Sequence, residues 1–305
     1  MRILVTGGAG FIGSNLAVDL ARSGHEVVVL DNFSSGHFDN LKDFPGDVVA
    51  ADVAENQWFA AVGKVGAVFH EAAITDTTVL DQKRMMEVNV EGFRRVLEFA
   101  LKYKVPRVVY ASSAGVYGNG PRPMKETQAP APNNIYAFSK KVMDQTAACF
   151  VKRHPRMKLI GLRYFNVYGP RENHKGGAAS MIWQLAEQMR SGKRPRVFKY
   201  GEQYRDFIHV KDVVKANLCA LNGKKSAIVN VCTGQGASFN RIIEILNGVF
   251  GFSLAPDYFD NPYGFYQDET LGDPVAAKLL LNFQADLNIE RGIESYIGAQ
   301  HGVPA

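Results

Sequence analysis

Short apolar runs recur along the chain, and between them lie longer segments whose apolar residues follow helical spacing. The runs are rich in β-branched residues, and we predict strands at 2–7, 26–31, 47–52, 67–72, 107–112, 159–165 and 228–233. Apolar residues are continuous within these runs, which indicates strands buried on both faces of a parallel sheet. Strands that alternate with helices predict a doubly wound, Rossmann-like α/β fold.

The regular alternation weakens after about residue 166, where Gly, Pro and aromatic residues become more frequent. We therefore expect a dinucleotide-binding domain at 1–166 and 205–236, and a smaller substrate-binding region at 167–204 and 237–305. Open α/β sheets bind ligands at the carboxyl ends of their strands. The smaller region is expected to cover that edge of the sheet.

Composition narrows the class of protein. The chain has 305 residues and a formal net charge of +5, and its Lys and Arg are scattered, so no nucleic-acid partner is expected. No apolar run approaches the about 20 residues that span a bilayer, and the N-terminal stretch lacks the pattern of a signal peptide. Cys149, Cys219 and Cys232 are far apart in apolar surroundings, as in reduced cytoplasmic proteins. The seven His show no metal-ligand spacing, so we expect a cytoplasmic protein without a metal.

The first predicted strand runs into a glycine-rich turn with Gly7, Gly10 and Gly13, and a helical pattern follows. Glycine lets the backbone turn tightly and approach a pyrophosphate, and the free N–H groups at a helix N-terminus favour anions. This context predicts a dinucleotide site.

Asp31 ends the second predicted strand, where a carboxylate accepts hydrogen bonds from the ribose diol of an adenosine and repels a 2′-phosphate. The following residues, NFSSGHF, contain no Lys or Arg that would offset this charge. We therefore expect NAD as cofactor, with NADP as the alternative. Asp52 and Val53, at the end of the third strand, are expected at the adenine edge.

A candidate catalytic group follows the fifth strand. Tyr136 and Lys140 are four residues apart and share one face of a helix, and Ser113 ends the preceding strand. An ammonium beside a phenol favours the phenolate and lowers the pKa of the tyrosine. The pair is then a general base that takes the proton of a hydroxyl group, while Ser113 holds that hydroxyl.

Together these motifs resemble the extended short-chain dehydrogenase/reductase superfamily, and within it the nucleotide-sugar epimerases and dehydratases. The resemblance covers nearly the whole chain through GGAGFIG, DNFSSG, FHEAA, NVEG, SSAGVYG, YAFSK, RYFNVYGP, YRDFIHVKD and NVCTG. It implies a sheet that binds NAD(P) and a C-terminal part that holds a nucleoside-diphosphate sugar. It also adds to the expected cofactor site Phe11, Ile12, Asn32, Ala72, Ala73 and Asn89.

Two local features narrow the reaction. Dehydratases of this family commonly carry an Asp-Glu pair after the strand-five hydroxyl, but here Ala114 and Gly115 occupy those positions and offer no proton-transfer group. The segment YFNVYGPRENHKG is similar to one in the ADP-glycero-manno-heptose 6-epimerases. In those enzymes the tyrosine and a second lysine, here Lys175, are thought to act from opposite faces of the reacting carbon.

Epimerisation through a ketone gives Lys175 a chemical role. Hydride must return to the other face of the carbon, and one fixed tyrosine cannot easily handle the proton on both faces. A second acid/base solves this problem if burial or cationic neighbours lower its pKa. Diphosphate binding and an ordinary solvated charge are the alternatives for Lys175.

The chain also departs from the heptose epimerases. His37 lies where those enzymes carry a Lys suited to NADP, and Gly264-Phe265-Tyr266-Gln267 replaces Gly-Arg-Tyr-Gln. The missing Lys argues against NADP as cofactor. The missing Arg removes one expected anion contact, so the exact sugar nucleotide is less well defined by the resemblance.

Further substrate contacts are expected after several strands. Asn166 is a candidate for a phosphate or sugar hydroxyl, and Arg205 for the diphosphate, since a guanidinium matches phosphate oxygens. A salt bridge to Asp206 is the alternative for Arg205. Thr75 offers a hydroxyl for sugar recognition or simple loop capping, and Tyr266 is a candidate lid residue.

The leading hypothesis is an NAD(P)-dependent ADP-glycero-manno-heptose 6-epimerase. A UDP-hexose 4-epimerase is the first alternative, and a non-enzymatic NAD(P)-binding sensor is an alternative of another class. A helix with an apolar stripe is expected at 84–103. In this superfamily the matching helix often pairs two subunits, so a homo-oligomer is expected, although core packing alone also explains the stripe.

Overall fold

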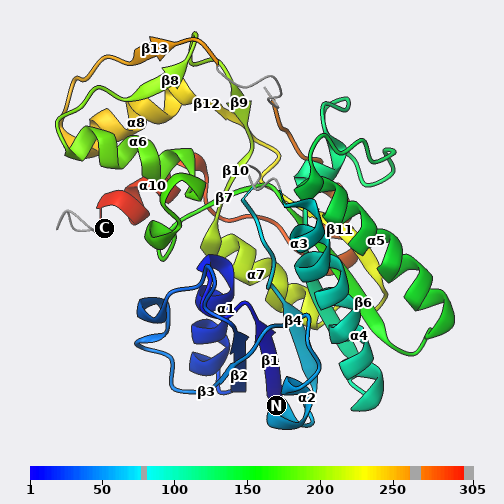
Figure 1. Ribbon diagram of the computed structural model, residues 1–305. Coiled ribbons are helices and arrows are strands. Elements are labelled where there is room, and N and C mark those ends of the chain that lie inside the picture. Colours follow the sequence, from blue (N-terminus) through cyan, green and yellow to red (C-terminus); the bar gives the residue numbers. More distant parts are fainter. Residues whose placement is uncertain (77–80, 262–268, 299–305) are drawn as a thin grey trace.

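The centre of the protein is a parallel sheet. A computed structural model describes residues 1–76, 81–261 and 269–298 (Figure 1). The seven strands lie in the order β11-β6-β5-β4-β1-β2-β3. Their bounds are β1 (Arg2–Thr6), β2 (Glu26–Asp31), β3 (Asp47–Ala50), β4 (Ala67–His70), β5 (Arg107–Ser113), β6 (Lys158–Tyr164) and β11 (Ala227–Val231). The order reverses direction after β3, as in doubly wound folds, so the predicted fold class is confirmed.

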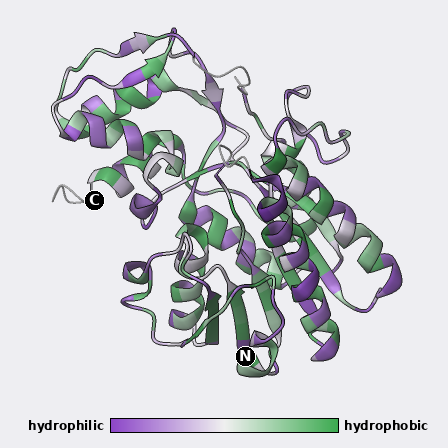
Figure 2. Ribbon diagram, in the orientation of Figure 1, coloured by the Kyte–Doolittle hydropathy of each residue, from purple (hydrophilic) through white to green (hydrophobic). Residues whose placement is uncertain are grey.

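Helices cover both faces of this sheet. On one face lie α1 (Phe11–Arg22), α7 (Val210–Leu221) and α9 (Val275–Leu281). On the other lie α2 (Trp58–Val62), α4 (Gly92–Lys102) and α5 (Ile135–Arg153). Figure 2 shows the strands between them as mostly hydrophobic. Because both faces are buried, the strands carry continuous apolar runs, and this is the pattern from which the sheet was predicted.

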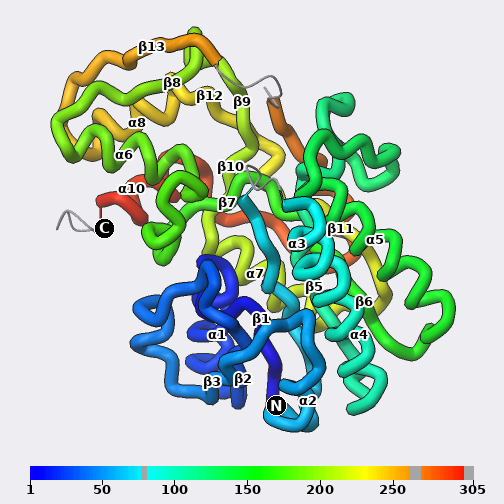
Figure 3. Tube along the Cα trace, viewed as in Figure 1, coloured from blue at the N-terminus to red at the C-terminus, as the bar shows by residue number. Residues whose placement is uncertain are grey.

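A third apolar cluster lies beyond the carboxyl ends of the strands. It is built from α6 (Met181–Arg190), α8 (Phe239–Phe250) and α10 (Ile289–Ile297). These helices are far apart in sequence but pack together, as their green, yellow and red segments show in Figure 3. Their cluster is separate from the two that cover the sheet. The proposed division into two domains stays a prediction.

Short strand pairs connect the sheet to this third cluster. β7 pairs with β10 in parallel, β9 pairs with β12 antiparallel, and β8 pairs with β13 in parallel. Their bounds are β7 (Asn166–Tyr168), β8 (Arg196–Phe198), β9 (Tyr204–Arg205), β10 (Phe207–His209), β12 (Ala237–Ser238) and β13 (Asp257–Phe259). The chain therefore crosses repeatedly between the sheet and the C-terminal cluster above it (Figure 1).

The helix expected at 84–103 is interrupted. The chain forms α3 (Gln82–Met86), then a π-helical turn at Glu87–Glu91, and then α4. Asn89 lies in this turn and is completely buried. A π turn accommodates one extra residue per turn, and such turns are frequent at functional sites. The single long helix was therefore wrong in its continuity, although its apolar face does pack on the sheet.

Three short 3₁₀ helices complete the described structure, η1 (Phe38–Leu41), η3 (Ala114–Tyr117) and η4 (Asn173–Ala178). Within the described ranges, every helix is too short or too polar to cross a membrane. The same part of the chain holds no cluster of side chains that could bind a metal ion.

Candidate active site

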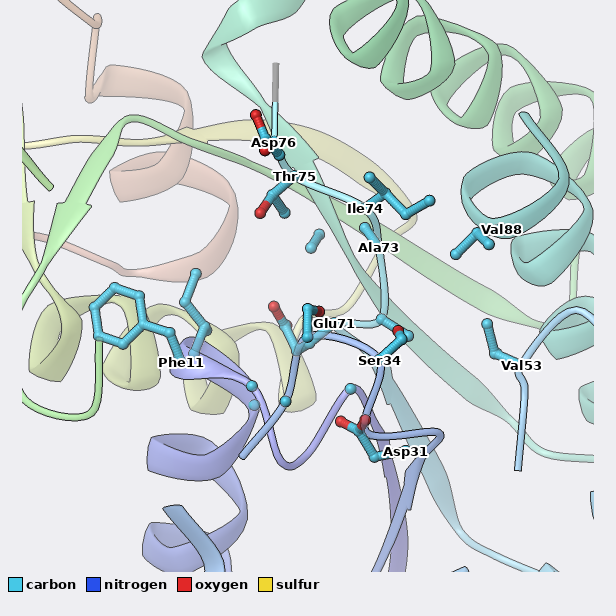
Figure 4. Close-up of a pocket in the computed structure, with 18 of the residues that line it drawn as sticks. Phe11, Asp31, Ser34, Val53, Glu71, Ala73, Ile74, Thr75, Asp76 and Val88 are labelled. Carbon is cyan, nitrogen blue, oxygen red and sulfur yellow. The ribbon is translucent and has the colours of Figure 1, made fainter. Parts of the chain in front are cut away.

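A cavity of about 640 Å³ lies at the carboxyl ends of the central strands. Figure 4 shows side chains that point into it from the loops after the strands and from α1. Most of the predicted site residues line it together. They are Gly7, Gly10, Phe11, Ile12, Gly13, Asp31, Asn32, Asp52, Val53, Ala72, Ala73, Thr75, Ser113, Tyr136, Lys140 and Lys175.

The glycine-rich turn forms the floor of the cavity where α1 begins. Gly7 has a φ of +69°, and a Cβ at Gly13 would lie 2.2 Å from the carbonyl oxygen of Gly7. A side chain at either position would strain the turn or collide with it. Gly10 caps α1 without a side-chain hydrogen bond, so backbone N–H groups at this helix end remain available to an anion.

Asp31 lies at the end of β2 beside this turn (Figure 4). Its carboxylate accepts a 2.9 Å hydrogen bond from the backbone N–H of Ala9 and a 2.8 Å bond from that of Phe33. These bonds fix the carboxylate while each oxygen keeps a lone pair for a ligand hydroxyl. The residues present therefore fit a dinucleotide, with the diphosphate at α1 and a ribose at Asp31.

The far end of the cavity is shaped by an ion pair. Arg84 donates a 2.7 Å hydrogen bond to Asp52, and the amide of Asn32 lies 3.3 Å from the same oxygen. Val53 and Val88 line the same cavity and lie near each other on one side of it (Figure 4). An apolar wall next to fixed polar groups suits a heterocyclic base. Arg84 was not identified from the sequence, because nothing in its local pattern connects it to Asp52.

Tyr136 and Lys140 lie in the first turns of α5, which is capped by the side chain of Asn134. The Lys140 ammonium donates a 2.8 Å hydrogen bond to the carbonyl oxygen of Ala111 and lies 5.8 Å from the centre of the Tyr136 ring. The hydroxyl of Tyr136 is hydrogen-bonded to Ser113. Ser113, Tyr136 and Lys140 therefore line the cavity together.

The pKa of Tyr136 differs from the expectation. Burial raises the pKa of Tyr136, the hydrogen bond to Ser113 lowers it, and the charge of Glu71 raises it. Lys140 was expected to lower the pKa of Tyr136, but burial is the largest influence and raises it. Burial also lowers the pKa of Lys140 to about 8, against the charges of Glu71 and Asp144. A further positive charge in the cavity would favour the phenolate.

Lys175 enters the same cavity from η4 and lies above α1. Its Nζ atom is 5.7 Å from the centre of the Phe11 ring. Burial lowers the pKa of Lys175, while the charges of Glu172 and Asp76 raise it. The loop is held by buried Glu172, whose carboxylate accepts hydrogen bonds from the backbone N–H of Gly169 and from Ser180. A lowered pKa makes the Lys175 ammonium a better proton donor than an exposed lysine.

Three predicted residues lie apart from the cavity lining. The Asn89 amide is used by the protein itself, since it bonds to both backbone groups of Ile74 and to Ser139. It therefore holds the segment after β4 against α5 and is absent from the cavity lining, unlike the expectation of a direct cofactor contact. Asn166 donates to Thr270 and to the carbonyl of Asp206.

Arg205 is buried and also lies outside the cavity lining. It donates a 3.2 Å hydrogen bond to the carbonyl oxygen of Tyr204. The neighbouring Asp206 carboxylate accepts hydrogen bonds from Thr233 and Gly234, so it ties β10 to the loop after β11. Tyr266 lies outside the described residues.

Glu71 and Tyr164 line the cavity, although neither was predicted from the sequence to have a role. Glu71 lies in the motif FHEAA, near the end of the strand predicted at 67–72, and it directly follows the observed β4. A carboxylate that follows a buried strand at the ligand-binding edge is a signal that could have identified it. Tyr164 lies within the strand predicted at 159–165, where its sequence does not distinguish it from a core residue.

Comparisons with known proteins agree with this geometry. Residues 3–232 match the model of the NAD dependent epimerase/dehydratase family. The chain is 37% identical to the ADP-L-glycero-D-manno-heptose-6-epimerase of Brachyspira hyodysenteriae, over 96% of each chain. Two solved structures superpose on nearly all of it. The Helicobacter pylori ADP-L-glycero-D-manno-heptose-6-epimerase has a TM-score of 0.90 and 39% identity, covering 99% of this chain and 96% of that one. The Thermotoga maritima UDP-glucose 4-epimerase, solved with UDP-glucose, has a TM-score of 0.93 and 30% identity, covering 100% of both.

Proposed function

The chain belongs to the NAD dependent epimerase/dehydratase family and is an NAD-dependent epimerase of nucleotide sugars, and we propose that it inverts the C6 centre of an ADP-glycero-manno-heptose. The observation that carries this proposal is the presence of two separate proton-transfer groups, Tyr136 and Lys175, in one cavity. The names of the relatives from Brachyspira and Helicobacter support the same substrate.

The cofactor site uses the glycine-rich turn and the end of β2. Gly10 and Gly13 leave room for the diphosphate at α1, and Asp31 accepts hydrogen bonds from the ribose. When bound, NAD supplies the hydride-transfer chemistry that oxidises the sugar carbinol to a ketone and later reduces the ketone. We propose that Asp31 selects NAD over NADP, because its carboxylate would repel a 2′-phosphate.

Tyr136 is the proposed base for the oxidation. Its Oη atom takes the proton of the sugar hydroxyl, and the Ser113 hydroxyl holds the same substrate oxygen. Lys140 stabilises the phenolate through its ammonium charge, which the carbonyl of Ala111 keeps in place. Because Ala114 and Gly115 have no group able to remove a second proton, the ketone is not channelled into loss of water.

Lys175 is the proposed acid for the reduction from the other face. When the ketone carbon is reduced there, its oxygen requires one proton, which the Lys175 Nζ donates. The proton given by Lys175 replaces the one taken by Tyr136, and the hydride removed from the carbon returns to it, so the configuration changes without net oxidation. The fixed position of Lys175 over Phe11 supports this role, as does its burial.

One observation favours a second candidate, a UDP-hexose 4-epimerase. The fold superposes on the Thermotoga maritima UDP-glucose 4-epimerase with a TM-score of 0.93. In that case inversion would occur on the sugar ring, and Lys175 would bind the diphosphate. The family relationship supports an enzyme over a non-enzymatic sensor.

NMR of purified protein with ADP-D-glycero-manno-heptose tests the proposal, with UDP-glucose and UDP-galactose as parallel samples. We expect a second set of heptose signals and unchanged UDP-hexoses. Conversion of the UDP-hexoses alone would overturn the 6-epimerase proposal in favour of 4-epimerisation.

We further propose a cytoplasmic homo-oligomer. The cysteines Cys149, Cys219 and Cys232, all within the described residues, form no disulfide, which supports a reducing compartment. Subunit pairing through α4 is supported by Leu101, an exposed apolar side chain on a helix whose other apolar residues pack on the sheet. Light scattering after size-exclusion chromatography measures the mass, and a mass of one chain would contradict pairing.

A further inference from the structure

Glu71 is a charged residue in the cavity that the proposed reaction does not use. It follows β4 directly, and its backbone N–H donates a 3.1 Å hydrogen bond to the carbonyl of Thr6. Its side chain lies in the middle of the cavity, between the glycine-rich turn and the segment that carries Thr75 (Figure 4). A carboxylate at this depth requires a protein partner or a cationic neighbour.

A chain of hydrogen bonds fixes the Glu71 carboxylate from behind. The Tyr164 hydroxyl donates a 2.9 Å bond to it, and the amide of Asn217 donates a 2.8 Å bond to the Tyr164 oxygen. Asn217 is completely buried on α7 and also donates to the carbonyl of Val213. Three elements, β4, β6 and α7, therefore hold one carboxylate at the edge of the sheet.

Lys140 reaches the same edge from the opposite face of the sheet. His70 pairs in register with Tyr110, so Glu71 and Ala111 are the next residues of adjacent strands. The carbonyl of Ala111 holds the Lys140 ammonium. The carboxylate of Glu71 and the ammonium of Lys140 thus line the same cavity at this edge of the sheet, and each favours the charged form of the other.

The other charged or titratable groups around this pair come from three elements. Asp144 on α5 also favours the ammonium of Lys140, and His70 on β4 is disfavoured as a cation by Lys140. Tyr136 on α5 and Tyr164 on β6 complete the set. Asp144 is already engaged with Arg163, whose guanidinium lies 2.9 Å from its carboxylate. Of the two carboxylates that favour the Lys140 ammonium, Glu71 is the one that lines the cavity.

The Lys140 ammonium needs a nearby negative charge because the side chain is almost fully buried. Burial lowers the pKa of Lys140 to about 8 even with Glu71 present, and burial raises the pKa of Glu71 to about 7. Without the carboxylate, the lysine would lose its proton closer to neutral pH. A neutral amine does not stabilise the phenolate of Tyr136.

We propose that Glu71 is a positioning residue that holds Lys140 in its ammonium form beneath the Tyr136 base. Glu71 acts through Lys140 and does not touch the reacting carbon. The effect of Glu71 on turnover rests on the proposed function, but its effect on the protonation of Lys140 does not.

The first test is a pH titration of lysine Cε signals by ¹³C NMR in the purified full-length protein with its cofactor. The Lys140 signal is assigned by its loss in Lys140→Arg. We expect Glu71→Gln to lower the Lys140 midpoint by about 1 pH unit or more. The matched control is Glu98→Gln, which removes the same charge from an exposed side chain on α4 and should leave the midpoint unchanged. An equal midpoint in wild type and Glu71→Gln would overturn the proposal.

The second test is the pH profile of kcat/KM for the epimerisation. We expect the alkaline limb of Glu71→Gln to move to lower pH, and Glu71→Asp to restore part of the shift. A variant that is only structurally damaged would lose activity at every pH without moving the limb, and that result contradicts the proposal.

Tyr164→Phe provides an independent variant if Glu71→Gln fails to fold. It keeps the carboxylate but removes the hydrogen bond that favours its ionised form. A smaller shift of the Lys140 midpoint in the same direction is expected, and no shift would count against the proposal. If the wild-type protein converts no heptose, the proposed function fails, while the Lys140 titration still decides the role of Glu71.

Discussion

The Nζ atom of Lys175 lies 5.7 Å from the centre of the Phe11 ring, at the first residue of α1. This contact places the lysine over the helix end expected to receive the diphosphate, and in the same cavity as Tyr136. The position is therefore compatible with proton transfer and with anion binding. The two roles differ in what a substitution removes.

Replacing Lys175 with Met separates these roles. If Lys175 is the second acid/base, turnover of the heptose should fall by about 100-fold or more, because general acid–base catalysis contributes that much. Affinity for the nucleotide sugar should change little, as measured by calorimetry beside NMR turnover. The control is Lys152→Met on the exposed end of α5, which should alter neither quantity. A large loss of affinity with an intact chemical step would assign Lys175 to binding.

Replacing Tyr136 with Phe should abolish oxidation of the substrate. The variant keeps the ring beside Lys140 but loses the oxygen that is hydrogen-bonded to Ser113. We expect turnover to fall by about 100-fold or more and NAD affinity to be retained. Single-turnover NMR with the heptose and calorimetric titration of NAD measure the two quantities. Near-normal turnover would refute Tyr136 as the base.

Replacing Gly13 with Ala should weaken NAD binding strongly. The new Cβ would lie 2.2 Å from the carbonyl oxygen of Gly7, so the turn must shift. Gly248→Ala on α8 is the matched control, because a Cβ there has no neighbour within 4 Å. That control should keep NAD affinity and gain up to about 1 kcal/mol of stability, since Ala favours helix. Equal NAD affinity in both variants would contradict the proposed diphosphate position.

Replacing Asp31 with Asn should change cofactor preference. The amide keeps the size of the side chain but loses the charge that binds the ribose diol and repels a 2′-phosphate. We expect NAD affinity to fall by about tenfold, as for loss of a charged hydrogen bond, and NADP affinity to fall less or to rise. Calorimetric titration of both cofactors measures the ratio. A proportional loss for both would show that Asp31 only braces the turn through Ala9 and Phe33.

His70 should make stability depend on pH. Burial, and then the charge of Lys140, lower its pKa to about 3, so the folded protein holds it neutral while the unfolded chain protonates near its ordinary value. The unfolded state therefore binds more protons below about pH 6.5, and stability falls as pH decreases through that window. Burial raises the pKa of Glu71 to about 7 and that of Asp206 to about 6, and both groups change stability in the opposite direction over the same pH range. The effect of His70 must therefore be measured as the difference in unfolding free energy between the wild type and a variant.

Comparing the wild type with the variant His70→Gln isolates the contribution of His70. The variant loses the 2.8 Å contact with Thr6 but also the penalty of protonation. Its deficit in unfolding free energy relative to wild type should shrink by about 2 kcal/mol between pH 7.5 and pH 5. Urea unfolding at both pH values measures this, and a constant deficit would contradict it.

The sheet and the cofactor turn could be predicted because their determinants are local. Continuous apolar runs identify buried strands, and the glycine spacing identifies the turn at α1. Contacts between distant residues could not be predicted in the same way. Asn89 joins Ile74 and Ser139 across 15 and 50 residues, and Glu71 meets Tyr164 across 93 residues. Only the folded chain shows that these polar groups satisfy one another.

The position of β11 has a consequence for synthesis on the ribosome. β11 completes the sheet by pairing with β6, yet residues 165–226 separate the two strands. While that segment is being translated, β6 presents an unpaired edge, and such edges are templates for wrong pairing with other chains. The nascent protein must therefore keep most of its nucleotide-binding sheet from aggregating until its last strand emerges.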